Sequence, residues 1–173
     1  ERDRRMIKIV AVGRIKEKAS KELIDEYVKR IRPYTKLTIT EVNEEIIPQS
    51  NSDAQNEAAK EAEGKAILKC ISDKDYVIAL DLHGKSFTSE QMAAKLDELN
   101  TYGHSDIVFV IAGSLGYSPE VIQRADMRWK LSDCTFPHQL VRVLVVEQIY
   151  RMFKINRHEP YHKLYLVKRL HFS

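Results

Sequence analysis

The stretch IVFVIAGSLG, residues 107–116, decides the fold of this chain. Six apolar residues, four of them β-branched, run without a break into a loop that has glycine at positions 113 and 116. Such a run predicts a strand buried on both faces, as in the centre of a parallel sheet. The two glycines predict a tight turn from this strand towards a helix, because glycine adopts positive φ at little cost.

The segments on either side repeat this alternation of strand and helix. Further strands are predicted at 7–12, 37–42, 76–82 and 129–131, and amphipathic helices at 20–32, 55–70 and 88–99. A fourth helix is predicted to begin at 118–119, and a long apolar helix is predicted at 139–155. Five strands that alternate with helices predict an α/β fold with an open, doubly wound parallel sheet. In such sheets ligands bind beyond the carboxyl ends of the strands. Here those ends fall at 80–82, 112–113 and 131–132.

Helix starts and turns can be predicted from single residues. Ser20 is expected to cap the first helix, and Ser118 followed by Pro119 is expected to begin the fourth. Capping boxes are expected at Ser52 with Gln55 and at Thr88 with Gln91. We also expect a turn at 83–84 directly after the third strand. The residues expected to face the core from the first two helices are Leu23, Ile24, Tyr27, Val28, Ile31, Ala58, Ala62, Ala66, Ile67 and Cys70.

Composition narrows the class of protein. The chain has 173 residues and a formal net charge of +3, from 28 basic and 25 acidic side chains, so any nucleic-acid site must be a local patch. Cys70 and Cys134 have neither disulfide-framework nor zinc spacing. No apolar run approaches the ~18 residues that a membrane span needs. We therefore expect a cytoplasmic protein with one domain over 6–163, preceded by a leader or expression remnant at 1–5.

Residues 158–162, HEPYH, match the zinc-protease pattern H-E-x-x-H. That chemistry needs both histidines on one face of a continuous helix. Pro160 disfavours such a helix, because proline inside a helix costs about 3 kcal/mol or more. We expect no bound metal, and the metal content of the purified protein tests the competing reading, a zinc hydrolase.

Two polar loops and one charged helix are the candidate sites. The loops 112–116 and 131–139 both leave a predicted strand and enter a helix, so together they could clasp a small ligand through backbone groups. In the last helix, Arg142, Glu147 and Arg151 interrupt an apolar run. Glu147 and Arg151 are four residues apart, which fits a structural ion pair as well as a substrate site. Basic and aromatic residues downstream suit RNA phosphates and a stacked base, and the alternative is a solvated tail. These residues are Lys154, Arg157, His158, Tyr161, His162, Lys163, Tyr165, Lys168 and Arg169.

Five motifs occur in an order and at spacings that resemble one known family over almost the whole of 6–163. They are AVGRIKEK, LDLHGK, FVIAGSLGYS, LSDCTFPHQLVRVLVVEQIYR and PYHK. The chain resembles the ribosomal large-subunit methyltransferase H family of the SPOUT superfamily. The resemblance implies a SPOUT-type open parallel sheet with a deep trefoil knot in its C-terminal part. It also implies a homodimer whose active site uses both subunits, and S-adenosylmethionine as the cofactor.

The resemblance also implies roles for individual residues. The implied cofactor-binding residues are Leu80, Ala112, Gly113, Gly116, Leu131, Ser132, Asp133, Cys134, Thr135 and Phe136. The implied catalytic residues are Glu147, Arg151 and His162, and the implied RNA-binding residues are Arg142, Tyr161 and Lys163. The family usually has two successive glycines where this chain has Ala112 and Gly113, and usually ends near the YHK element. Residues 164–173 would thus be an atypical extension.

The implied substrate is N3 of a pseudouridine in 23S ribosomal RNA, within the large subunit or the assembled ribosome. Methyl transfer requires the nucleophile to be aligned with the methyl group, and the imide nitrogen must lose its proton. Glu147 or His162 could accept this proton, and Arg151 could stabilise the negative charge on the ring. The alternative is a ribosome-associated RNA-binding protein that kept the fold without catalysis.

Overall fold

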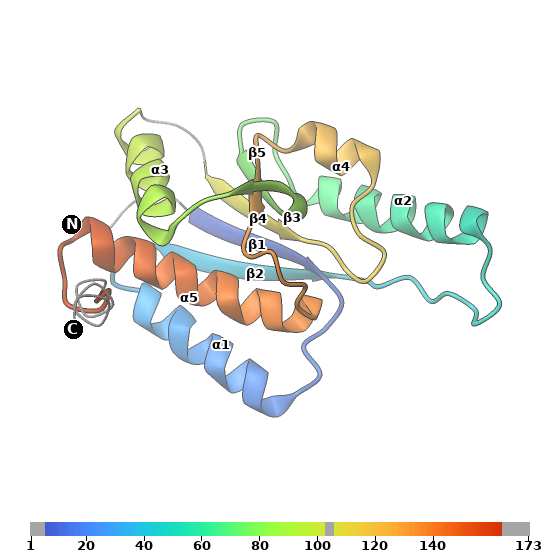
Figure 1. Cartoon of the computed structure of the whole chain (residues 1–173), viewed down its shortest axis with the longest axis horizontal. Helices are drawn as coiled ribbons and strands as arrows, with labels where there is room; N and C mark the ends of the chain where they lie inside the picture. Colours follow the sequence, from blue (N-terminus) through green and yellow to red (C-terminus); the bar gives the residue numbers. More distant parts are fainter. Residues whose placement is uncertain (1–5, 103–105, 164–173) are drawn as a thin grey trace.

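The computed structural model describes residues 6–102 and 106–163. The leader and the extension expected at 1–5 and 164–173 lie outside the described residues. Within the described part, strands and helices alternate along the chain (Figure 1). The elements are β1 Met6–Val12, α1 Lys18–Ile31, β2 Lys36–Val42, α2 Asp53–Lys69, β3 Tyr76–Ser86, α3 Ser89–Thr101, β4 Ile107–Ile111, α4 Pro119–Arg124, β5 Met127–Lys130 and α5 His138–Asn156.

The strands form one open sheet in the order β2-β1-β4-β3-β5, and every pairing in it is parallel. This confirms the predicted α/β class and the parallel sheet. β4 is central, and all five of its residues are buried, as its unbroken apolar sequence predicted. Since all the strands point the same way, their carboxyl ends meet along one edge, where loops can form a shared site.

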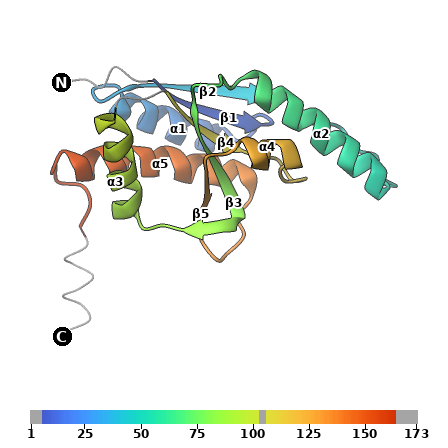
Figure 2. The ribbon, with the colours of Figure 1, turned by 90° about the horizontal axis from the view of Figure 1, so that it is seen from above.

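Helices cover both faces of the sheet (Figures 1 and 2). On one face α1, α3 and α5 pack over a core that includes Ile9, Phe109 and Trp129. On the other face α2 and α4 cover a smaller core that includes Val10 and Val110. In the described ranges, no helix is both long and apolar enough to cross a membrane.

The predicted caps are confirmed with one exception. Ser52 and Thr88 each form a capping box with the glutamine three residues later, and Ser118 caps α4 ahead of Pro119. The prediction that Ser20 caps the first helix is wrong, because α1 already begins at Lys18 and its N-cap, Glu17, makes no side-chain cap bond. The periodic apolar stripe, and not a cap, defines this helix.

Two further predictions are wrong in part. β3 does not end at the turn expected at 83–84 but continues to Ser86; Leu80 and Lys85 both pair with Trp129 of β5, so residues 81–84 bulge out of the ladder at that point. Ala58 and Ala62 are exposed on α2, whose buried residues are Glu63, Gly64 and Ile67, and Leu23 is exposed on α1. Glycine is required at position 64 because α2 passes close to the start of α4. A Cβ on Gly64 would collide with the side chain of Ser118.

Candidate functional site

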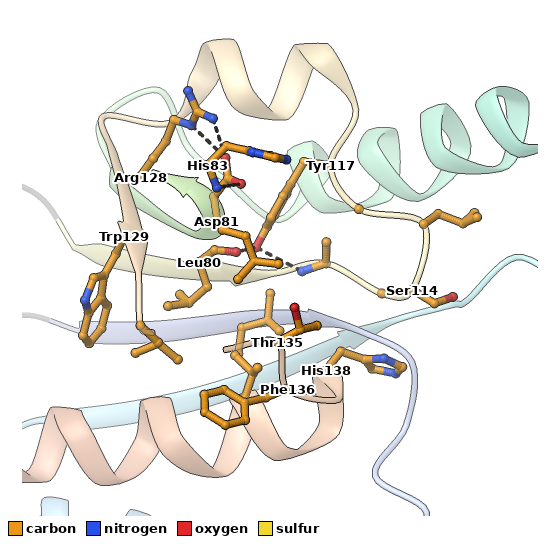
Figure 3. A pocket seen from close by; sticks show the side chains of 18 of the residues that line it. Leu80, Asp81, His83, Ser114, Tyr117, Arg128, Trp129, Thr135, Phe136 and His138 are labelled. Atoms are coloured by element: carbon orange, nitrogen blue, oxygen red, sulfur yellow. Dashed lines mark hydrogen bonds and ion pairs between the residues drawn. The ribbon is translucent and has the colours of Figure 1, made fainter. Parts of the chain in front are cut away.

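A pocket of about 630 Å³ lies where β3, β4 and β5 end (Figure 3). We call it the strand-end pocket. Its volume is within the range of about 300–1,000 Å³ that is usual for small-molecule sites. It is lined by Lys60, Leu80, Asp81, Leu82, His83, Ile111, Ala112, Gly113, Ser114, Leu115, Gly116, Tyr117, Ile122, Arg128, Trp129, Leu131, Ser132, Cys134, Thr135, Phe136, Pro137, His138 and Val141.

The first wall is the loop that follows β4. Gly116 has a φ of +83°, and its N–H donates to the carbonyl of Gly113 at 3.1 Å, which closes a tight turn. Gly113 is held close to β1, since a Cβ on it would lie 3.0 Å from Cγ1 of Val12. The glycine loop therefore reaches the pocket with its backbone close to the sheet, as the sequence predicted.

The second wall is the loop between β5 and α5. The Ser132 hydroxyl accepts from the backbone N–H of Cys134 at 3.0 Å, which shapes the loop. Asp133 is the one predicted cofactor residue that does not line the pocket. Its side chain is 91% exposed and pairs with Lys130 at 2.6 Å, which lowers the pKa of its carboxyl. The structure thus brings together nine of the ten residues that the resemblance implied, and it leaves Asp133 outside.

Two polar side chains in the pocket, Asp81 and Tyr117, were not among the predicted cofactor residues. Asp81 is 7% exposed and pairs with Arg128 of β5 at 2.7 Å, and it also accepts from the backbone N–H of His83 at 3.0 Å. Tyr117 points into the gap between the ends of β3 and β4 (Figure 3). Neither residue belongs to a recognisable motif. The sequence indicated only where they lie: Asp81 is at the end of an apolar run, and Tyr117 follows the glycine loop.

A second group of polar side chains lies on the C-terminal half of α5 and beside it; we call it the α5 polar cluster. It consists of Glu90, Glu147, Arg151, Tyr161 and His162. Glu147 Oε1 accepts from Arg151 at 2.6 and 3.0 Å and from the Tyr161 hydroxyl at 2.9 Å. Arg151 also lies 2.9 Å from Nδ1 of His162, while Nε2 lies 2.5 Å from Glu90. The predicted ion pair is therefore part of a larger network.

The hydrogen bonds of His162 define its tautomer. Arg151 is only a donor, so Nδ1 accepts, and the proton sits on Nε2, which donates to the Glu90 carboxylate. This bond lowers the pKa of Glu90. Burial raises the pKa of Tyr161, and so does its hydrogen bond to Glu147, so its hydroxyl stays a donor. Arg151 stacks over the Tyr161 ring at 4.8 Å. Nothing in the sequence around Glu90 indicated this contact.

The α5 polar cluster does not line the strand-end pocket. Val141, near the start of α5, lines the pocket, and Arg151 lies ten residues further along the same helix. At 1.5 Å per residue this is about 15 Å. Within one chain, the implied catalytic residues and the implied cofactor residues are therefore separated.

Two other predicted residues are placed clearly. Arg142 is 2% exposed, pairs with Glu41 at 2.5 Å and donates to the carbonyl of Gly13 at 3.0 Å. In this structure its guanidinium therefore joins α5 to the ends of β1 and β2, and its contact with RNA stays a prediction. Lys163 is exposed at the end of the described chain.

The H-E-x-x-H segment is not a helix. α5 ends at Asn156, and His158 has a φ of +54°. His162 instead contacts Glu90 and Arg151. In the part of the chain that the structure describes, no group of three or more histidine, cysteine, aspartate or glutamate residues could hold a metal ion.

An open parallel sheet with a small-molecule pocket at its strand ends fits several classes of α/β protein, and comparison with known proteins separates them. The family profile described as "Predicted SPOUT methyltransferase" matches residues 6–162, and the chain belongs to this methyltransferase family. A solved structure of a probable methylase family protein from Haemophilus influenzae supports the fold alone. It is 14% identical, covers 91% of this chain and 70% of its own, and gives a TM-score of 0.52.

Named relatives indicate which methyltransferase family within this group the chain belongs to. The ribosomal RNA large subunit methyltransferase H of Lactiplantibacillus plantarum is 52% identical over 157 residues, which is 91% of this chain and 99% of the relative. The protein with the same name from Carboxydothermus hydrogenoformans is 50% identical over the same shares. Identity at this level over nearly the whole of both chains places this chain in the methyltransferase H family.

Proposed function

We propose that this protein transfers a methyl group from S-adenosylmethionine to N3 of a pseudouridine in 23S ribosomal RNA. The observation that carries the proposal is the strand-end pocket, which gathers nine of the ten implied cofactor residues from three separate segments. The close relatives are named as ribosomal RNA large subunit methyltransferases, which supports this reaction and this class of substrate. It also supports a cytoplasmic site of action, where ribosomes are made.

The pocket fits the proposed cofactor in size and chemistry. Leu80, Ile111, Leu131 and Phe136 offer apolar walls for an adenine, and the two loops offer backbone groups for its polar edges. When bound, the cofactor would supply an electrophilic methyl group on a sulfonium. The protein's own contribution is to orient the reactants and to exclude water, which accounts for much of the acceleration of an in-line displacement.

The α5 polar cluster is the proposed catalytic group. Arg151 supplies a positive charge that can stabilise the deprotonated imide of the base. Its position is fixed by two bonds to Glu147 and one to His162. Either Glu147 or His162 accepts the imide proton. His162 must first release Arg151 from Nδ1, whereas Oε2 of Glu147 accepts one bond, from Gln148, and has a lone pair left for the proton. Tyr161, which belongs to this cluster, and the exposed Lys163, which follows His162 in sequence, are proposed to contact the RNA.

We further propose a homodimer in which one subunit provides the pocket and the other provides the α5 polar cluster. The separation of about 15 Å between them in one chain supports this arrangement. α1 and α5 lie side by side over one face (Figure 1), and each leaves a leucine exposed, Leu23 and Leu140, both at 45%. A dimer interface over α1 and α5 would cover both side chains.

The family also leads us to propose a single domain over 6–163 with a trefoil knot in its C-terminal part. The return of α5 from the edge strand β5 to the face covered by α1 and α3 is compatible with such threading. Threaded chains are rare in proteins. Refolding from complete denaturation should therefore be slow compared with unknotted domains of this size.

Transfer of a labelled methyl group tests the proposed function. Ribosomes and free large subunits that lack the modification would be incubated with the protein and tritiated S-adenosylmethionine, and the labelled nucleotide would be identified by mass spectrometry. We expect label on N3 of one pseudouridine. Failure to label either substrate, together with no heat of cofactor binding by calorimetry, would overturn the proposal. RNA binding without label would instead support a non-catalytic binding protein.

A further inference from the structure

The strands β3 and β4 separate at their carboxyl ends, and a tyrosine hydroxyl lies between them. Their last paired residues are Ala79 and Val110. Leu80 is one residue beyond on β3, and Ala112 is two residues beyond on β4. The slanted hydrogen bonds of a parallel ladder join groups with this offset. A further rung would therefore run from the N–H of Ala112 to the carbonyl of Leu80.

Tyr117 takes the place of that rung. The N–H of Ala112 donates to the Tyr117 hydroxyl at 3.2 Å, and the hydroxyl donates to the carbonyl of Leu80 at 2.6 Å. The carbonyl of Val110 lies 2.8 Å from the same oxygen and shares the proton. Burial raises the pKa of Tyr117, so the hydroxyl keeps this proton. Figure 3 shows the side chain reaching from the loop to this point.

The inserted hydroxyl has a geometric consequence for the pocket. The two backbone groups are bridged by two hydrogen bonds in series, so the strand ends stay further apart than one direct rung would allow. Leu80 and Ala112 both line the strand-end pocket. Tyr117 also belongs to the loop that the turn from Gly113 to Gly116 folds back over the sheet. One side chain thus sets both the loop and the opening between the strands.

We propose that Tyr117 is a positioning residue for the cofactor, whose hydroxyl replaces a rung between β3 and β4 and keeps the strand-end pocket open. The inference rests on the proposed function, because it treats this pocket as the cofactor site. The bridge also determines which polar groups a ligand meets at the edge of the pocket between Leu80 and Ala112. The single hydrogen of the Ala112 amide is used by Tyr117, whereas the carbonyl of Leu80 keeps a second lone pair. A ligand at this edge therefore meets an acceptor, which suits an amino group.

The test compares two tyrosine-to-phenylalanine variants. Tyr117→Phe keeps the ring and removes the bridge, so we expect the Kd for S-adenosylmethionine, measured by calorimetry, to rise about ten-fold. KM for the cofactor should rise similarly, with a smaller change in kcat. Tyr34→Phe is the matched control. Tyr34 is 6% exposed and donates to Glu159 at 2.9 Å, and it does not line the pocket. It should lose thermal stability and keep its cofactor affinity.

Two results would overturn the inference while leaving the proposed function intact. One is an unchanged Kd in Tyr117→Phe, which would make the hydroxyl purely structural. The other is tighter binding, which would make the hydroxyl an occupant of the site that the cofactor displaces.

Amide exchange of the wild-type protein by NMR adds a measurement that needs no variant. The Ala112 amide should be protected although it lies beyond the β3–β4 ladder, and exchange at the rate of an open loop would contradict the bridge. A wild-type protein without affinity for S-adenosylmethionine would overturn both proposals.

Discussion

The strand-end pocket and the α5 polar cluster are built in opposite ways. The pocket is formed by three segments around the ends of β3, β4 and β5, and much of its wall is apolar or backbone. The cluster is formed by side chains that carry charge or a strong dipole and bond to one another. A largely apolar pocket suits a ligand that must be held, whereas a cluster of charged side chains suits a reaction that moves a proton. The proposed function therefore assigns binding and catalysis to separate parts of this chain.

Arg151→Ala should break the cluster and leave the pocket unchanged, and this is the largest expected effect. Without its guanidinium the charge on the imide loses its stabilising partner, so we expect kcat to fall about 10²-fold or more. The Kd for S-adenosylmethionine and the dimer mass should not change. Single-turnover methyl transfer, calorimetry and light scattering measure the three quantities.

Arg124→Ala is the matched control for this change. Its side chain is also 24% exposed, and it pairs with Asp126 at 3.2 Å away from both sites. It should lower the melting temperature and keep kcat. If Arg151→Ala behaved in the same way, Arg151 would be only the structural partner of Glu147.

Mixing two inactive variants tests whether the two regions come together across a dimer. Gly116→Val should disable the pocket, because Gly116 has a φ of +83° that a β-branched residue adopts only with strain. Arg151→Ala disables the cluster. In a random mixture half of the dimers are mixed, and each has one intact composite site of two. Activity should therefore recover to about a quarter of the wild-type value.

The control for mixing is each variant assayed alone at the same total concentration. Recovery requires subunit exchange, so the two chains would be refolded together or co-expressed with different tags. If the mixed dimers, isolated through both tags, were as inactive as the parents, the active site would lie within one subunit.

Acid should weaken the anchoring of His162, and this is the smallest effect. Because the hydrogen bond to His162 lowers the pKa of Glu90, its contribution to stability is complete above its ordinary value of 4.5 and is lost as the pH falls through the lowered pKa. The Glu90 side chain is 40% exposed, so we expect a difference of only a few degrees in Tm. Melting curves of wild type and Glu90→Gln between about pH 3 and pH 6 should converge at the acid end.

The surface variant Glu57→Gln serves as control for the acid titration. Glu57 is 57% exposed and pairs with Lys60 on α2, far along the sequence from His162. Its melting curves should follow those of the wild type throughout. Parallel curves for Glu90→Gln and wild type, without convergence, would show that the contact with His162 contributes nothing to stability.

Local sequence patterns were sufficient for most of the fold. The apolar run of β4 and the two capping boxes act through neighbouring residues, so they could be interpreted without tertiary contacts. The continuation of β3 beyond 83–84 was missed because it depends on a distant partner. After the bulge at 81–84, β5 pairs with β3 again and extends it as a strand, and β5 lies more than forty residues away in sequence.

In the candidate site, too, local features could be predicted from the sequence, whereas contacts between distant residues could not. Gly116 could be recognised in the sequence because its positive φ is a local property of the turn. The ion pair of Arg142 with Glu41 from β2 was not predicted, because no pattern in the helix itself signals it. Glu90 and Tyr117 were missed because their importance lies in partners distant in sequence or in a backbone gap between strands. Pairing across the fold is the information that one sequence does not provide.

α5 connects the two regions as a single uninterrupted helix, and this limits how the protein can evolve. Each residue added or removed between Val141 and Glu147 would turn everything downstream by about 100° and shift it by about 1.5 Å. Arg151 and His162, which both lie downstream, would then leave the side on which His162 meets Glu90 of α3. Loops elsewhere can gain or lose residues at little cost, but this segment can change only by substitution. Among descendants of this gene, we expect the number of residues from Val141 to Arg151 to stay constant even where most of their identities change.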